Sequence, residues 1–143
     1  MATQLFPFTI TVVRSCANPQ TLAPSATVDQ EYTITDTAKT YTVPAFTYTP
    51  TYCDPVYSFS VVPADGQLAI NFDSTPTVRT FTFFNDNNVA LAGPTATTYS
   101  ITVTAVLGTA ATLTETTTFS LTLKNPCIDP LFVKIDKVAL PSG

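Results

Sequence analysis

Apolar and polar residues alternate with a period of two along most of this chain, which is the pattern of β-strands that bury one face. No stretch shows the 3.6-residue period of an amphipathic helix. The apolar anchors of the predicted strands are Phe6, Phe8, Ile10, Val12; Tyr32, Ile34; Tyr41, Val43, Phe46; Tyr57, Phe59, Val61; Leu68, Ile70, Phe72; Phe81, Phe83; Tyr99, Ile101, Val103, Ala105; Phe119, Leu121, Leu123; and Leu131, Val133, Ile135. Short strands at this spacing predict an all-β fold, an antiparallel sandwich of about seven to nine strands.

The opening segment repeats near the end of the chain. Residues 8–19 align without a gap on residues 119–130, so that Phe8 matches Phe119 and Cys16 matches Cys127 at the same offset of 111 residues. A fixed period indicates a repeat architecture. We therefore expect residues 1–15 to be the last strand of a preceding repeat, residues 16–126 a complete domain, and residues 127–143 the first strand of a following repeat. Two unrelated strands of similar sequence are the alternative.

Composition narrows the class of protein. Charged residues make up 11% of the chain, the net charge is −4, and the six Lys and Arg residues are scattered. Nucleic-acid binding needs clustered cations, so it is not expected. No apolar run reaches the length of a membrane span. No signal peptide is apparent, which indicates either a leader already removed or a piece of a longer protein.

The cysteines follow from the repeat interpretation. Cys16 opens the complete domain and Cys53 lies inside it, whereas Cys127 opens a repeat whose inner cysteine would lie beyond the end of the chain. This predicts a Cys16–Cys53 disulfide, with Cys127 as a free or intersubunit thiol, in an oxidising compartment. Three buried, reduced thiols are one alternative. Pairing of Cys127 with Cys16 of another copy is a second.

The stretch from Tyr57 to Lys124 resembles the immunoglobulin-like, dystroglycan-type cadherin-like repeats of large extracellular proteins. The motifs that carry this likeness are Tyr57-Ser-Phe-Ser-Val, Asp65-Gly66-Gln-Leu, Ile70-Asn-Phe-Asp73, Arg79-Thr-Phe-Thr, Tyr99-Ser-Ile-Thr-Val-Thr-Ala105 and Thr118-Phe-Ser-Leu-Thr-Leu-Lys-Asn125. The resemblance implies an immunoglobulin-like sandwich with Tyr99 at a corner, its hydroxyl bonded to upstream backbone. The Cys-x-x-Pro opening and the mid-repeat cysteine also resemble tandem arrays in giant surface proteins of microbes.

Two departures from this family argue against a calcium role. Thr98 stands where the family has Gly, and residues 105–108 are neutral where it often has an acidic residue. Calcium prefers six to eight oxygens from several carboxylates. The run from Asn85 to Asn88 brings one carboxylate and is interpreted as a loop. The better calcium candidates, near the predicted junctions, are Asn18, Asp54 and Asp129.

Catalytic chemistry is not indicated. The chain has no His, so a serine or cysteine nucleophile would lack its usual base. Ten acidic residues, among them Asp65, Asp73 and Asp86, are enough in number for a glycosidase pair, but nothing in their placement beyond turns supports one. We expect no enzyme activity and no cofactor. Lys124 and Asn125 are candidates for an intramolecular isopeptide bond, without a partner that the sequence identifies.

Two features suit a binding module instead. Thr-x-Thr pairs, which in a flat array would bind ice or glycan, occur at Thr9/Thr11, Thr33/Thr35, Thr47/Thr49, Thr80/Thr82, Thr102/Thr104 and Thr112/Thr114. Their uneven spacing favours the ordinary exposed faces of strands, where Thr is common. The second feature is an aromatic cluster of Tyr48, Tyr52 and Tyr57 near Pro50.

The terminal strands suggest the function. An unpaired strand leaves apolar side chains and backbone donors in water and is a template for pairing with another chain. The sequence therefore predicts a structural module of a tandem extracellular array or filament, whose partners are neighbouring copies or repeats. The expected interface residues are Phe6, Phe8, Ile10, Val12, Leu131, Val133 and Ile135. An adhesin-type domain that binds glycan or ice, and a viral surface protein, are the alternatives.

Overall fold

The computed structural model describes residues 6–34, 36–64, 69–84 and 97–126. These residues form nine strands and no helix, as the pattern of alternation predicts. The strands are β1 (Thr21–Ala23), β2 (Gln30–Thr33), β3 (Lys39–Thr42), β4 (Thr47–Thr49), β5 (Val56–Val62), β6 (Ala69–Asp73), β7 (Thr80–Phe84), β8 (Thr97–Leu107) and β9 (Leu113–Lys124). The described part of the chain holds no helix that could cross a membrane.

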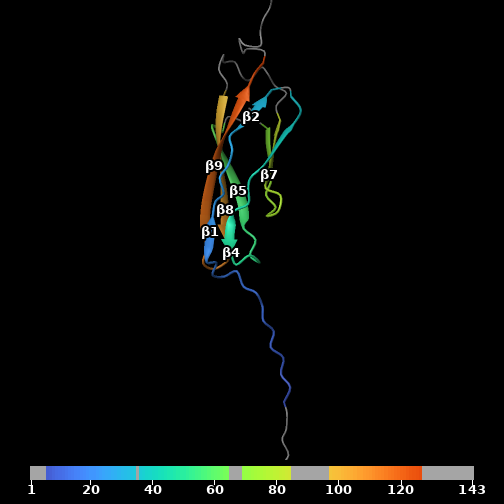
Figure 1. Ribbon diagram of the computed structural model, residues 1–143, viewed down its shortest axis with the longest axis vertical. Coiled ribbons are helices and arrows are strands. Elements are labelled where there is room, and N and C mark those ends of the chain that lie inside the picture. The colour runs from blue at the N-terminus through green and yellow to red at the C-terminus, as the bar shows by residue number, and fades with distance from the viewer. Residues whose placement is uncertain (1–5, 35, 65–68, 85–96, 127–143) are drawn as a thin grey trace, which may run out of the picture.

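The strands form one four-stranded sheet in the order β2-β9-β8-β5, one three-stranded sheet in the order β3-β7-β6, and a short β1-β4 pair (Figure 1). Five of the six strand pairs are antiparallel, but β2 runs parallel to β9. The expectation of a wholly antiparallel fold is therefore wrong for that pair. Alternation determines which face a side chain occupies, but it carries no information on strand direction.

The core lies between the two larger sheets. From Tyr99 onward on β8 and from Phe119 onward on β9 every second residue is buried, Ile101 opposite Phe119 for example. Phe81 on β7 contacts Phe119 of the other sheet with 5.5 Å between ring centroids, and Phe59 on β5 with 5.3 Å. Side chains of the two sheets thus interdigitate, which is consistent with a β-sandwich. Burial of such side chains stabilises the fold by about 1.5–3 kcal/mol each.

The turn between β8 and β9 is hydrogen-bonded to residues 16 and 17, where the N-terminal part of the chain joins the folded body. Gly108 has φ +103°, and a Cβ there would lie 2.4 Å from the carbonyl oxygen of Ala111, so only glycine fits. Beyond it, the Thr109 amide donates to the Cys16 carbonyl at 3.1 Å and the Ala111 amide donates to the Ala17 carbonyl at 2.8 Å. Residues 16 and 17 are therefore anchored at this end of the sheet.

Residues 6–13 belong to no strand, although their alternation predicts one. They extend away from the body at one end of the long axis (Figure 1). A strand exists only with a partner, and within the described chain this segment has none. Of the other predicted elements, Leu131, Val133 and Ile135, the Asp65–Gly66 turn and the Asn85–Asn88 loop lie outside the described residues. The division of the chain into three segments stays a prediction.

Candidate interaction surface

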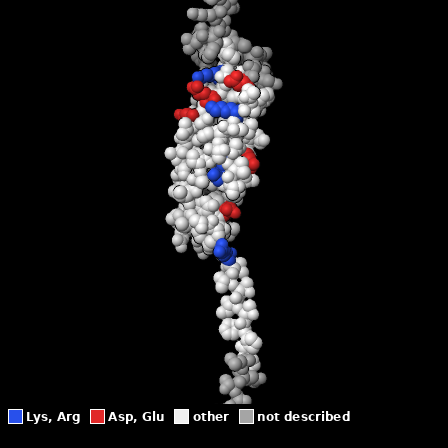
Figure 2. Space-filling model, turned by 45° about the vertical axis from the view of Figure 1, so that its right-hand side comes forward, with Lys and Arg blue, Asp and Glu red and all other residues white. Residues whose placement is uncertain are grey.

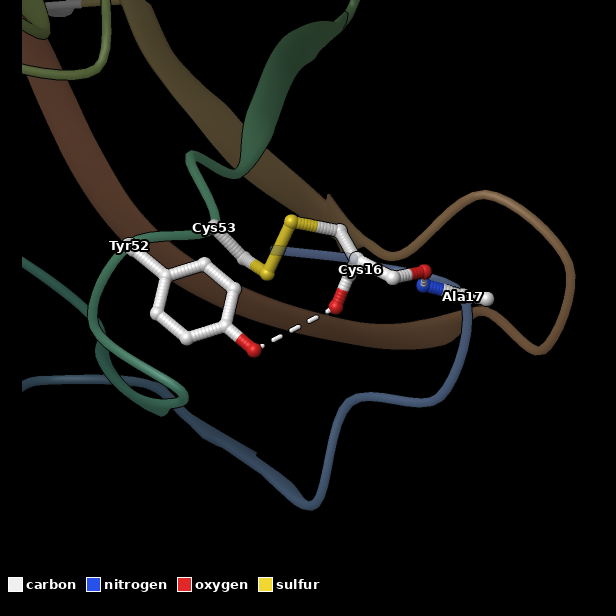
Figure 3. Close-up of a disulfide and its surroundings, with 5 residues drawn as sticks. Cys16, Ala17, Tyr52 and Cys53 are labelled. Atoms are coloured by element: carbon white, nitrogen blue, oxygen red, sulfur yellow. Dashed lines mark hydrogen bonds between the residues drawn. A yellow bond between two sulfur atoms is a disulfide. The ribbon is translucent and has the colours of Figure 1, made fainter. Parts of the chain in front are cut away.

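A disulfide links Cys16, where the N-terminal part of the chain joins the folded body, to Cys53 in the segment that precedes β5. The Sγ atoms of Cys16 and Cys53 are bonded, and their Cα atoms lie 5.6 Å apart (Figure 3). This is the pairing predicted from the repeat. Cys53 is buried and Cys16 is half-buried, so the bond ties the entering chain directly to the core. Cys127 lies outside the described residues.

Further contacts hold the base of the extended segment, which we define as residues 6–15 and call the terminal segment. The Arg14 guanidinium lies 5.2 Å from the centre of the Tyr52 ring, a cation–π contact. The Tyr52 hydroxyl donates to the Ser15 carbonyl at 3.4 Å (Figure 3). Together with the disulfide, these contacts direct the segment away from its own domain.

The terminal segment is apolar and exposed. The exposed fractions of Phe6, Phe8, Ile10, Val12 and Val13 lie between 73% and 86%. No charged residue precedes Arg14 in the described part of the segment. Figure 2 shows charged side chains gathered at the opposite end of the body, where Lys124 pairs with Glu31 at 2.7 Å. An apolar segment of this kind is characteristic of an interaction site.

The outer edge of β5 is the second exposed feature. Among the described strands β5 pairs only with β8, so its other edge carries no partner. Val56 and Val62 are exposed by 71% and 66%, and Phe59, whose ring contacts the core, by 37%. The strand contains no charged residue, which leaves this edge without the usual protection against pairing.

The outward face of the four-stranded sheet is rich in hydroxyl groups. The register places Ser60 opposite Thr102, and Thr102 opposite Thr118. The hydroxyls of Thr102 and Thr118 are 3.0 Å apart. Ser58, Thr104 and Thr116 form a neighbouring row. These residues are unevenly spaced along the sequence, but the register aligns them in rows across the three strands β5, β8 and β9.

The half-buried Arg79 contacts Tyr57, which is buried in the core. The Arg79 guanidinium lies 5.8 Å from the centre of the Tyr57 ring, donates from Nε to the Val43 carbonyl at 3.2 Å and from Nη1 to the Pro76 carbonyl. Arg79 has φ 45°, which is rare for a residue with a side chain. Burial raises the pKa of the Tyr57 hydroxyl above its ordinary value, and the Arg79 charge opposes this rise only in part.

This raised pKa predicts a loss of stability in alkaline solution. Above about pH 10 the unfolded chain loses the Tyr57 proton, whereas the folded chain keeps it. Because the unfolded state then binds fewer protons than the folded state, rising pH stabilises the unfolded state relative to the folded one. The contribution is fully present below that pH and is lost as pH rises. We expect Tyr57→Phe to lose less free energy of unfolding than the wild type between neutral and alkaline pH, measured by urea titration. Equal losses in both proteins would contradict the assignment.

The other candidate sites are not brought together. Tyr57 is buried in the core beside Phe46 at 5.6 Å, whereas Tyr52 is exposed, so the three tyrosines share no binding surface. Asn18 and Asp54 are exposed, and the described residues contain no cluster of three potential metal ligands. Asp129 lies outside the described chain. Tyr99 is buried near the start of β8, and its predicted corner role stays a prediction.

A scan against protein-family models gives no match for this chain, and a search of curated proteins gives none either.

Proposed function

We propose that this chain is a non-catalytic, immunoglobulin-like module of an extracellular array or filament, and that its terminal strands join it end to end with neighbouring copies or repeats. The observation that carries the proposal is the terminal segment, which holds five exposed apolar residues and points out of one end of the body. β9 runs toward the opposite end (Figure 1). Entry and exit at opposite ends suit a linear series of domains.

The strand order supports the immunoglobulin-like assignment. In that fold seven strands divide into an ABED sheet and a CFG sheet. If β1 and β2 are the two parts of strand A, and β3 and β4 the two parts of strand B, then β5, β6, β7, β8 and β9 are C, D, E, F and G. The pairs β1–β4, β3–β7 and β7–β6 then form ABED, and β5-β8-β9 forms CFG.

The repeat supports the role of the terminal segment. Phe8, Ile10 and Val12 correspond to Phe119, Leu121 and Leu123, and these three residues of β9 are buried in the core. The terminal segment thus has the sequence of a core strand but lies outside any core. Pairing with another domain would bury the same face that β9 buries.

The disulfide supports an extracellular location. Disulfides persist in oxidising compartments and are rare in the reducing cytosol. In an array, Cys127 would occupy the place of Cys16 at the next domain, so each junction would carry one bond between a domain's entry and its inner cysteine. Such a bond suits a protein under mechanical load.

Deletion of residues 1–14 tests the proposal. The full chain is expected to associate as its concentration rises, whereas the truncated chain, which keeps Cys16 and the whole body, is expected to stay monomeric. Sedimentation velocity at matched concentrations measures both. Circular dichroism provides the control that the truncated chain is folded. Equal association of the two chains would rule out end-to-end assembly through this segment.

A further inference from the structure

The described sheet edges differ in how well they resist pairing. Natural edge strands are short or carry charged residues that prevent the addition of another strand. β2 and β3 have four residues each and carry Glu31 and Lys39, and β6 ends at the exposed Asp73. β5 has seven residues, with no charge, proline or glycine. It is the longest and least protected edge among the described strands of the two larger sheets.

The aromatic core reaches the surface at this edge. The Phe59 ring contacts Phe72 and Phe81 with centroid distances of 5.4 Å and 5.3 Å, yet Phe59 is 37% exposed. Phe72 on β6 is only partly buried as well. A strand added beside β5 would cover the exposed part of this aromatic cluster.

The terminal segment matches β5 on both faces. On β5, Tyr57, Phe59 and Val61 point inward and Ser58 and Ser60 point outward. In the terminal segment Phe8, Ile10 and Val12 alternate with Thr9 and Thr11. One alignment places the apolar residues beside Phe59 and at the same time extends the hydroxyl rows from Ser60 to Thr9 or Thr11. A slip by one residue would turn threonines toward the core and lose both matches.

We propose that the terminal segment of one copy adds as a further strand to the outer edge of β5 in a second copy, with Phe8 and Ile10 inward and Thr9 and Thr11 on the hydroxyl face. This inference rests on the proposed end-to-end assembly and specifies its acceptor. The lengths agree: at about 3.3 Å per residue, residues 6–13 span about 26 Å and β5 about 23 Å.

The acceptor is a second copy because of the contacts at the base of the segment. Folding back onto its own β5 would require reversal of the chain just before Cys16 and would break the contacts of Arg14 and Ser15 with Tyr52. From residue 6 to residue 15 the terminal segment runs in the same direction along the long axis as β5, because β8 ends at the turn beside Cys16 and β5 is antiparallel to β8. Neighbours in one orientation would therefore pair these strands in parallel, as β2 and β9 pair.

Cross-linking between differently tagged copies tests this acceptor. In full-length protein with Cys127→Ser, a size-tagged Thr11→Cys chain is mixed with an untagged chain that carries Ser58→Cys or Ser60→Cys, and then mildly oxidised. The expected result is a heterodimer whose linked peptides, identified by mass spectrometry, join residue 11 to β5. Asn71→Cys on β6 is the matched control, because Asn71 is also exposed on an edge strand. We expect several-fold less heterodimer from it.

Two outcomes would overturn the acceptor. One is equal cross-linking of Thr11→Cys to Asn71→Cys and to the β5 positions. The other is a Thr11→Cys/Ser60→Cys double variant that links only within one chain. If the chain that lacks residues 1–14 loses association while either outcome occurs, only the acceptor is wrong. If that truncated chain associates normally, the proposed function itself fails.

Discussion

Replacement of Phe81 by alanine is expected to lower the free energy of unfolding by about 3–5 kcal/mol, because the substitution leaves a cavity at the centre of the core. Phe81 is fully buried. The distance between ring centroids is 4.3 Å to Phe72, 5.3 Å to Phe59 and 5.5 Å to Phe119. Phe72 belongs to the same sheet as Phe81, whereas Phe59 and Phe119 belong to the facing sheet, so Phe81 contacts both sheets. Urea unfolding followed by circular dichroism measures the change.

Phe84→Ala is the matched control for this substitution. Phe84 belongs to the same strand, and its replacement by alanine removes the same atoms as Phe81→Ala. Unlike Phe81, however, Phe84 is 44% exposed. We expect a cost well below that of Phe81→Ala, since less apolar area returns to water and no enclosed cavity forms. If the two variants lost similar stability, Phe81 would not be the centre of a core between two sheets.

The core segments of β8 and β9 were predictable because apolar and polar residues alternate there without interruption. On β8, Tyr99, Ile101 and Val103 are buried and the residues between them point outward, as a period of two requires. On β9 the same holds for Phe119 and Leu121. Where a strand packs against the facing sheet, one of its faces is continuously buried, and the sequence records this as alternation.

Direction and register were not predictable, because they depend on how distant segments meet. β1 has only three residues and lies in a short stretch bounded by Pro19 and Pro24, too short for alternation to be recognised. The parallel pairing of β2 with β9 leaves no local mark in either strand. The hydroxyl row through Ser60, Thr102 and Thr118 is likewise a product of register, and spacing along the chain hides it.

The terminal segment shows that the alternation of a strand does not by itself indicate that the strand pairs within its own chain. Phe8, Ile10 and Val12 have the alternation of a buried strand, but all three are exposed. The pattern records which face would be buried with a partner, and it does not record whether the same chain supplies that partner. The cysteine pairing was easier to predict, since the predicted repeat assigns Cys127 to a following domain and leaves Cys16 and Cys53 as the pair, which is the pair that is bonded.

Removal of the disulfide is the second large effect that we expect. Cys16→Ala/Cys53→Ala should lower the free energy of unfolding by about 3–4 kcal/mol, because the bond closes a loop between residues 37 apart in sequence and so restricts the unfolded chain. Urea unfolding without reductant measures this loss. Cys127→Ala is the control, since Cys127 takes no part in the bond, and it should retain nearly full stability.

The same double variant separates stability from assembly. The disulfide fixes residue 16 to the core, and this anchor sets the direction in which the terminal segment leaves the body, so its loss should weaken association even where the domain remains folded. Sedimentation velocity of the double variant, at a temperature where circular dichroism reports a folded domain, tests this. Association equal to that of the Cys127→Ala control would show that the segment needs no anchor. A folded variant that associates poorly would tie the bond to assembly, because the terminal segment itself is unchanged.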